Sequence, residues 1–331
     1  MLLQKTEDGL YCAAGGFHID PWRPVKVAII THAHSDHVRP GSALYLTEES
    51  GREILQLRLG PDARVESIPY GESIAHDGVK VSFHPAGHIL GSAQVRIEHN
   101  GEVAVVSGDY KLENDGLCPP FEPVRCHHFV TESTFGLPIY RWRLQAEIFS
   151  EINQWWRENQ ALGRASILFC YALGKAQRVL AGLDPSIGPI FVHGAVERYL
   201  PAYRRAGANF PTVGKYLDSS RNERGSSFVI APRSADNSPW MRKFGEVSTA
   251  CASGWMQVRG ARRRRSLDRG FVLSDHADWN GLLQTVKATG AEKIWVTHGY
   301  SHQLARWLRE AGWQADALET RYGEEIESDA E

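Results

Sequence analysis

The sequence has few cysteines and no long hydrophobic run. Five cysteines, without the paired spacing of a disulfide framework, are dispersed over 331 residues: Cys12, Cys118, Cys126, Cys170 and Cys251. An odd, dispersed set is typical of a reducing compartment, so we expect a cytoplasmic protein. No apolar stretch approaches the roughly 18 residues that span a bilayer, and the N-terminus lacks the apolar core of a secretory signal. We therefore expect no membrane partner.

The net charge of -2 is small, but the two signs are segregated along the chain. Residues 143–269 carry 20 Lys and Arg against 10 Asp and Glu, whereas the remainder carries 17 against 29. A basic segment in an otherwise acidic chain indicates either a polyanionic partner or a solvated surface without one. The length and the 42% hydrophobic content are ordinary for a globular protein and suffice for two compact units.

Three of the 14 histidines lie in one six-residue stretch, His-Ala-His-Ser-Asp-His at 32–37. The stretch follows the apolar, β-branched run 27–31, which predicts a buried strand. Imidazole and carboxylate groups are common metal ligands, and His32, His34, Asp36 and His37 offer more groups than one tetrahedral ion needs. The alternative is a polar turn that happens to be rich in histidine. The position behind a buried strand favours a site for two metals.

Further predicted strands also end in side chains that can bind a metal or a proton. These strands are predicted over 79–84, 103–107, 128–131, 271–273 and 294–297. The side chains that follow them are His88, Asp109, Glu132, His276 and His298. Such recurrence indicates ligands gathered at one edge of a sheet. Asp20 ends an earlier strand, where it either stabilises the turn or accepts a hydrogen bond from a ligand imidazole.

The middle of the chain has an α/β alternation of its own. After a break at 138–143, helices are predicted over 145–163, 174–181 and 197–206, and strands over 166–169, 190–193 and 228–231. We therefore expect an inserted domain over 143–269 and a first domain built from 1–142 and 270–331. The inserted domain is also the basic one.

Together these motifs resemble the metallo-β-lactamase fold, specifically its β-CASP group of nucleic-acid hydrolases. The H-x-H-x-D-H signature of the fold is matched at 32–37. Its early aspartate, later histidine and bridging aspartate are matched by Asp20, His88 and Asp109. The resemblance covers essentially the whole chain. It implies an α/β fold, namely an αββα sandwich with an inserted β-CASP α/β domain.

Three later motifs are specific to the β-CASP group. Glu132 in Thr-Glu-Ser-Thr matches the first, His276 in Ser-Asp-His-Ala-Asp the second, and His298 in Thr-His-Gly the third. The stretch 172–177 is similar to the one that opens the inserted domain.

The resemblance implies a two-metal nuclease. One metal is then held by His32, His34 and His88 and the other by Asp36, His37 and His298, with Asp109 between them. Two such ions, Zn²⁺ or Mn²⁺, can share a hydroxide and clamp a phosphodiester for in-line attack. The catalytic groups are accordingly Asp36 and Asp109, His276 as general acid or phosphate-oxygen donor, and Glu132, which keeps His276 protonated.

The inserted domain is expected to contact the substrate. Arg262 and Arg263 belong to the densest basic run, which either neutralises phosphates or forms a solvated loop. Ser253 and Gly254 lie among small residues whose backbone N–H groups can approach a terminal phosphate. Lys175, in the stretch that opens the domain, is the remaining candidate contact.

Within the group, the compact length and the absence of a long C-terminal extension most resemble the bacterial ligase-associated DNA exonucleases. This likeness implies 5′-to-3′ digestion of single-stranded DNA or duplex ends in DNA repair, with a DNA ligase or other repair proteins as partners. Three alternatives stay open: an RNA-processing β-CASP ribonuclease, a small-molecule metallo-hydrolase, and a non-catalytic nucleic-acid-binding module. No single residue separates DNA from RNA.

Overall fold

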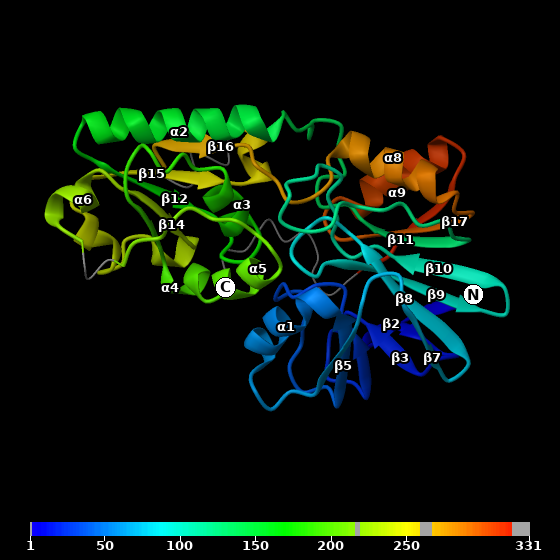
Figure 1. Cartoon of the computed structure of the whole chain (residues 1–331). Helices are drawn as coiled ribbons and strands as arrows, with labels where there is room; N and C mark the ends of the chain where they lie inside the picture. The colour runs from blue at the N-terminus through cyan, green and yellow to red at the C-terminus, as the bar shows by residue number, and fades with distance from the viewer. Residues whose placement is uncertain (1, 216–218, 259–266, 320–331) are drawn as a thin grey trace. The chain divides into compact units, whose positions relative to one another are not determined.

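The computed structural model of the chain describes residues 2–215, 219–258 and 267–319. They form two compact units (Figure 1): the first comprises the residues up to Arg141 and from His276 onward, and the second comprises Trp142–Asp275. The divisions thus fall at 141/142 and 275/276, against the expected 142/143 and 269/270. The later second division has a physical reason, because β16 (Arg269–Phe271) extends the sheet of the second unit.

The first sheet of the first unit has six strands in chain order: β1 (Leu3–Thr6), β2 (Gly9–Cys12), β3 (Phe17–Ile19), β4 (Val27–Ile29), β5 (Leu44–Glu48) and β6 (Val65–Ile68). Strands β1 to β3 are antiparallel, and β3 to β6 are parallel. Helix α1 (Arg52–Leu59) connects β5 to β6 and packs on this sheet, burying Ile54 and Leu55.

The second sheet has seven strands in the order β18-β17-β11-β10-β9-β8-β7. They are β7 (Ser73–His76), β8 (Val79–Pro85), β9 (Ala93–His99), β10 (Glu102–Val106), β11 (His128–Glu132), β17 (Lys293–Thr297) and β18 (Gln314–Ala317). Strands β7 to β10 are antiparallel, and β10, β11, β17 and β18 are parallel. Helices α8 (Trp279–Thr289) and α9 (Ser301–Glu310) cover its outer face (Figure 1).

The first unit has two apolar cores, one on each face of the second sheet, and neighbouring residues of β11 pack into different cores. Val130 on β11 packs with Phe17 and Phe83 between the two sheets, whereas Phe129 packs with Leu282 and the other apolar residues of α8 and α9. Successive side chains of a strand point to opposite faces, so the consecutive apolar residues Phe129 and Val130 each lie in a different core. This αββα arrangement, with an inserted α/β unit, confirms the predicted fold class.

The second unit is built on a fully parallel five-stranded sheet in the order β13-β14-β12-β15-β16. Its other strands are β12 (Ala165–Phe169), β13 (Ile190–Val192), β14 (Phe228–Ala231) and β15 (Val247–Ala252). Its helices are α2 (Gln145–Ala161), α3 (Lys175–Ala181), α4 (Gly194–Glu197), α5 (Leu200–Arg205) and α6 (Arg221–Gly225). The single helix expected over 197–206 is therefore two short helices. Pro201 has no backbone N–H to donate, which suits the first turn of α5 rather than a helix interior.

Within the part of the chain that the structure describes, no helix is both long and apolar enough to cross a membrane.

Candidate metal centre

The candidate side chains lie at the ends of elements of the first unit. The stretch 32–37 follows β4, His88 follows β8, Asp109 follows β10, Glu132 ends β11, and His298 follows β17. In the second sheet β11 pairs in parallel with both β10 and β17, with Glu132 opposite Thr297. The carboxyl ends of these three strands therefore deliver their polar residues to one edge.

Left-handed backbone shapes the loops at this edge. Gly87 precedes His88 with a φ of 72°, and Gly108 precedes Asp109 with a φ of 55°. A Cβ on Gly108 would lie 2.7 Å from Thr31 Oγ1, so glycine is required there. His298 has a φ of 53°, which costs a residue other than glycine on the order of 1–3 kcal/mol. Glycine adopts such turns readily at 87 and 108, whereas at His298 the surrounding fold has to hold the turn.

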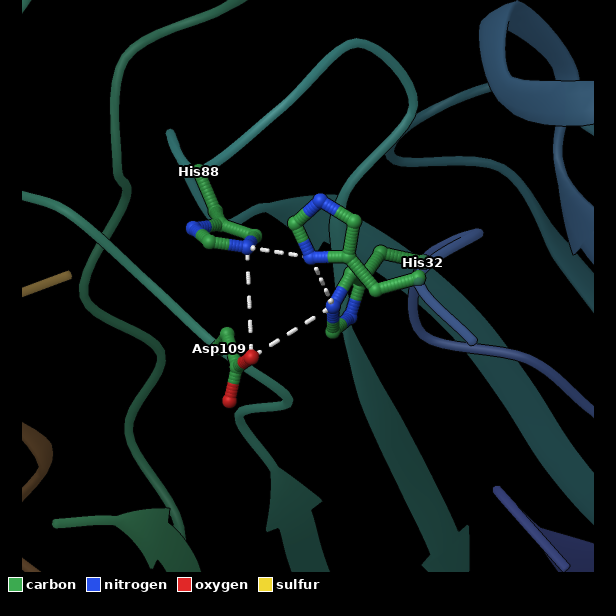
Figure 2. Close-up of side chains that lie close together, drawn as sticks. His32, His88 and Asp109 are labelled. Carbon is green, nitrogen blue, oxygen red and sulfur yellow. Dashed lines mark hydrogen bonds and ion pairs between the residues drawn. The ribbon is translucent and has the colours of Figure 1, made fainter. Parts of the chain in front are cut away.

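His32, His34, His88 and Asp109 form a first group of candidate ligands (Figure 2). His34 Nδ1 lies 3.2 Å from His32 Nε2 and 3.1 Å from His88 Nε2. Asp109 Oδ2 lies 3.4 Å from His32 Nε2 and 3.8 Å from His88 Nε2. One atom of each side chain thus faces the same point.

These separations fit a cation. Four ligands at about 2.0–2.1 Å from a tetrahedral Zn²⁺ are about 3.3–3.4 Å apart, close to the values in the first group. Three neutral imidazoles carry only one N–H each, and mutual hydrogen bonds cannot satisfy three nitrogens that converge on one point. The chemistry of this donor set therefore suits a divalent metal ion.

Asp36, His37 and His298 form a second group beside the first. His37 Nε2 lies 3.6 Å from Asp36 Oδ2, and the His37 and His298 rings stack with their centroids 5.0 Å apart. His37 Nε2 also lies 3.4 Å from Asp109 Oδ2, the oxygen that faces the first group. Asp109 therefore lies between the two groups.

Two buried atoms of this centre lack hydrogen-bond partners among the described residues: His37 Nε2 and Asp109 Oδ1. An unsatisfied buried nitrogen or carboxylate oxygen is costly unless something else binds it. Both atoms belong to candidate ligands, so a bound cation accounts for them.

Asp20 orders the protons behind the centre. Its Oδ2 accepts a hydrogen bond from His37 Nδ1 at 2.7 Å and another from the Thr31 hydroxyl at 2.6 Å. Since Thr31 Oγ1 uses its proton on Asp20, it accepts the Nδ1 proton of His32 at 3.1 Å. Asp20 thus leaves Nε2 of both imidazoles with a free lone pair, the tautomer that a metal requires. The sequence suggested Asp20 but not Thr31, which resembles any other strand residue.

Burial and charge act together on these groups. Burial lowers the pKa of His32 and of His88 well below the ordinary value, and neighbouring imidazoles lower it further. Burial also acts to lower the pKa of His37, but the carboxylates around it, that of Asp109 above all, raise it well above the ordinary value. Burial acts to raise the pKa of Asp109, yet His37 and other imidazoles hold it well below the usual range. Neutral His32 and His88 and an ionised Asp109 are therefore in the forms that bind metals, whereas His37 has to release its Nε2 proton when a cation binds.

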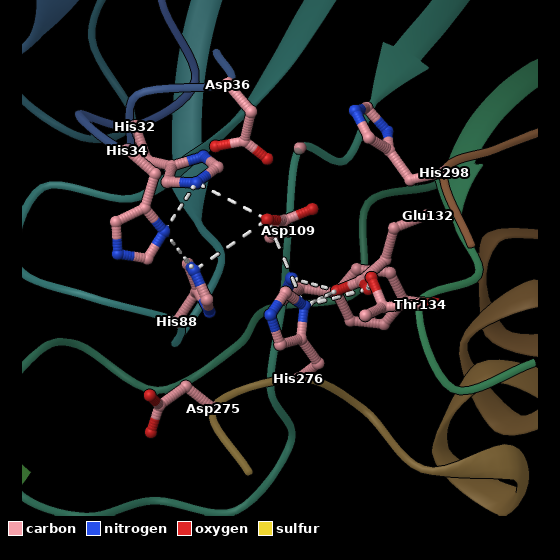
Figure 3. Close-up of polar contacts among 12 residues, drawn as sticks. His32, His34, Asp36, His88, Asp109, Glu132, Thr134, Asp275, His276 and His298 are labelled. Atoms are coloured by element: carbon pink, nitrogen blue, oxygen red, sulfur yellow. Dashed lines mark hydrogen bonds and ion pairs between the residues drawn. The ribbon is translucent and has the colours of Figure 1, made fainter. Parts of the chain in front are cut away.

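His276 and Glu132 form a hydrogen-bonded pair beside the first group (Figure 3). His276 Nδ1 lies 3.0 Å and 3.2 Å from the two carboxylate oxygens of Glu132, and 3.9 Å from Asp109 Oδ2. Glu132 also accepts hydrogen bonds from the Tyr110 backbone N–H at 2.7 Å and the Thr134 hydroxyl at 2.5 Å. These donors, of which the sequence indicated neither, fix the carboxylate. The His276 side chain is 16% exposed, so its ring is accessible.

The predicted substrate contacts belong to the second unit or to the part of the chain outside the described residues. Ser253 and Gly254 follow β15 in the second unit, and the buried Ser253 hydroxyl accepts a hydrogen bond from the backbone N–H two residues on. Lys175 is buried in the same unit, 3.7 Å from the Asp275 carboxylate. The basic run lies largely outside the described residues, and so do Arg262 and Arg263.

Comparison with known proteins gives relatives by sequence but not by family model, because no family model matches the chain. A probable DNA ligase from Opitutus terrae is 31% identical over 318 residues, which are 95% of this chain and 31% of that protein. Cleavage and polyadenylation specificity factor subunit 3 from Dictyostelium discoideum is 32% identical over 125 residues, 37% of this chain. Endoribonuclease YSH1 from Saccharomyces cerevisiae is 31% identical over 123 residues, also 37% of this chain.

The chain spans only part of these relatives, 31% of the first and 16% of each of the other two. A solved structure, that of a protein of unknown function from Enterococcus faecalis V583, has a TM-score of 0.56 at 12% identity. The match covers 89% of this chain and 79% of that one, and it shows a likeness of fold.

The αββα layers, with histidines and aspartates gathered at one sheet edge, define a protein of the metallo-β-lactamase fold. The inserted α/β unit and the relatives narrow the class. The chain is similar to nucleases of the β-CASP group of this fold, and its inserted unit is consistent with that group.

Proposed function

We propose that the protein is a metal-dependent phosphodiesterase that digests DNA from the 5′ end during repair. One observation carries the proposal. Six His and Asp side chains converge around Asp109, and Nδ1 of His276, the partner of Glu132, lies 3.9 Å from Asp109 Oδ2. Hydrolysis of a phosphodiester needs an activated water, charge neutralisation at phosphorus and a proton for the departing alkoxide. This set of groups is suited to supply all three.

The proposed ligands are His32, His34 and His88 for one ion and Asp36, His37 and His298 for the other, with Asp109 shared. When bound, two divalent cations supply Lewis acidity at a phosphoryl oxygen and lower the pKa of water into the neutral range. Mixed nitrogen and oxygen ligands suit Zn²⁺ or Mn²⁺, and we propose one of these.

His276 is the proposed proton donor. The Glu132 carboxylate can only accept a hydrogen bond, so the facing Nδ1 of His276 carries a proton. The second ring nitrogen is then the one that gives its proton to the departing oxygen. The negative charge of Glu132 favours the protonated imidazole before transfer, and the Tyr110 and Thr134 donors keep Glu132 in place.

DNA is the substrate favoured over RNA. The relative that aligns with 95% of the chain is named a probable DNA ligase, whereas the match to the endoribonuclease covers only 37%. The same relative supports a DNA ligase as partner. RNA cleavage is the second candidate, since an endoribonuclease is 31% identical to this chain over 37% of its length. A small-molecule hydrolase has no evident use for the His276–Glu132 pair. Residence in the cytoplasm stays a prediction.

Single-turnover cleavage of matched DNA and RNA oligonucleotides, labelled at the 5′ or the 3′ end, tests the proposal. Each reaction is run with Zn²⁺ and with Mn²⁺. We expect faster cleavage of DNA, with 5′-terminal mononucleotides or short fragments released first from the 5′-labelled strand. Faster cleavage of RNA would contradict the DNA assignment, and initial release from the 3′ end would contradict the polarity.

A further inference from the structure

Three buried charged side chains of the second unit meet at the residue that precedes His276. Arg178 Nη1 lies 3.1 Å from Asp275 Oδ1, and Lys175 Nζ lies 3.7 Å from Asp275 Oδ2. The three side chains are 2–5% exposed. Each carboxylate oxygen of Asp275 therefore faces a different cation, both from helix α3. Removing one member of such a buried set leaves a charge without its compensation.

Arg178 also holds the backbone. The same Nη1 donates a hydrogen bond to the Ser274 carbonyl oxygen, and Nε donates one to Gln145 Oε1 at 3.1 Å. A guanidinium carries its N–H groups in one rigid plane, so it can bind two consecutive residues while a third fixes it. Ser274 and Asp275 are thus fixed to α3, and Arg178 is itself fixed to the first residue of α2.

His276 directly follows the two residues that Arg178 and Lys175 contact. Asp275 and His276 are consecutive in the chain (Figure 3). On the other side, the Ala277 N–H donates to the Tyr110 carbonyl oxygen at 2.7 Å, and Asp278 caps α8 by accepting from the Gly281 N–H at 2.8 Å. The backbone is therefore restrained immediately before and immediately after this histidine. The ring of His276 is oriented by its hydrogen bond with the Glu132 carboxylate.

We propose that Arg178, Lys175 and Asp275 are positioning residues for His276. By fixing Ser274 and Asp275, they restrain the backbone from which the His276 imidazole projects. The inference rests on the proposed function, because it assigns a role relative to the general acid. It also assigns Lys175 to Asp275 rather than to a phosphate.

Kinetics of Arg178→Met on the DNA substrate test the proposal. A displacement of about 1 Å in a reacting group can lower a rate about 100-fold. We therefore expect kcat to fall about 10- to 100-fold while KM stays within about threefold and metal content is unchanged. Arg178→Lys should recover part of the loss, since it keeps a cation at Asp275 but cannot also reach Ser274 and Gln145. Lys175→Met should likewise lower kcat.

A matched control comes from the same unit. Arg157 on α2 pairs with Asp184 at 2.8 Å on the exposed surface, so Arg157→Met removes an arginine and an ion pair far from Asp275 in sequence. We expect it to leave kcat unchanged. Asp275→Asn keeps the side-chain shape and carries the same test if Arg178→Met does not fold, as judged by thermal melting.

A second readout does not depend on activity. In protein labelled with ¹³C at histidine Cε1, the His276 signal is assigned by its loss in His276→Gln. We expect it to shift or broaden in Arg178→Met and to be unchanged in Arg157→Met. A folded Arg178→Met protein with wild-type kcat and an unchanged signal would overturn the proposal. A Lys175→Met variant whose KM alone rises would overturn the role given to Lys175 and favour phosphate contact. A wild-type protein that cleaves neither DNA nor RNA would instead overturn the proposed function, and the NMR comparison would still decide whether His276 is positioned as inferred.

Discussion

Asp20 and His37 are joined by a hydrogen bond of 2.7 Å from imidazole Nδ1 to carboxylate Oδ2, although 16 residues separate them in the chain. The same oxygen accepts the Thr31 hydroxyl, which in turn accepts the Nδ1 proton of His32. One carboxylate therefore sets the tautomer of two candidate ligands, one in each group.

Asp20→Asn should weaken metal binding. An amide keeps the shape of the side chain but loses the charge, so Nδ1 of His37 and the Thr31 hydroxyl lose their strongest acceptor. Loss of such a partner typically lowers metal affinity about 10- to 100-fold, which competition with a chromogenic chelator measures. The matched control is Asp77→Asn, because Asp77 also has a positive φ, of 48°, but lies in the β7–β8 turn. Equal affinities in the two variants would contradict the role of Asp20.

Asp109→Ala should abolish cleavage while nucleic-acid binding survives. Asp109 is the residue shared by both groups, and losing several kcal/mol of charge stabilisation corresponds to a rate loss of about 10³-fold or more. Gel-shift titrations over a salt series should still show salt-sensitive binding, since basic side chains provide the electrostatic part of the affinity for nucleic acid. Asp316→Ala, at a carboxylate 80% exposed, serves as control. Wild-type activity in Asp109→Ala would refute the catalytic interpretation.

Glu132→Gln should slow cleavage. A neutral amide no longer provides the charged acceptor that holds the His276 ring, at 3.0 Å from Nδ1. We expect the rate to fall about 10²- to 10⁴-fold, as when general acid catalysis is removed. The double variant with His276→Gln should be little slower than His276→Gln alone. Additive losses would show that the two residues act separately.

His128 should make the fold sensitive to mild acid. Its ring is 2% exposed, neither ring nitrogen has a hydrogen-bond partner among the described residues, and burial lowers its pKa from 6.5 to about 4. As the pH falls, the unfolded chain therefore takes up a proton at His128 before the folded protein does. This group leaves the free energy of unfolding unchanged above about pH 6.5 and lowers it as the pH drops from about 6.5 to about 4.

His128→Phe keeps the edge-to-face contact with Trp295 and removes the titrating group. Its unfolding free energy, measured by urea titration at pH 8 and pH 5, should fall less than that of the wild type by roughly 1–2 kcal/mol. The exposed His302, replaced by Phe, gives the control. Identical pH dependence in wild type and His128→Phe would contradict the burial argument.

The parts of the site that lie directly after buried strands could be predicted from the sequence. A β-branched apolar run followed by His, Asp or Glu locates His88, Asp109 and His298 without knowledge of the pairing, and the structure brings these residues together. The connections between them could not be predicted. Thr31 becomes part of the centre only because Asp20 folds back onto it, a contact that depends on the parallel pairing of β3 and β4. That the seven candidate side chains bind metal ions stays a prediction.

Edge elements were the least predictable part of the fold. Strand β7 has no fully buried residue, because Ser73 and Ala75 are exposed and the residues between and after them are half-buried. Its sequence therefore gives no strong alternation of apolar and polar residues. Strand β18 is similarly exposed and forms by pairing with β17. Lys175 illustrates the same limit in a side chain. The sequence suggested Lys175 as a substrate contact, whereas its side chain is buried 3.7 Å from Asp275, 100 residues away in the chain.

The left-handed turns at Gly87, Gly108 and His298 bear on how the protein acquires its ions. Protein contacts restrain these turns, since the His298 carbonyl oxygen accepts a hydrogen bond from the Ser133 hydroxyl and the Ala86 carbonyl oxygen accepts one from the Lys111 N–H. We therefore expect the ligand loops to fold before the ions bind. Extraction with a chelator should therefore give a folded apoprotein, and adding the ions back should restore it without a refolding step. The cations are then expected to bind a site whose ligand loops are already folded.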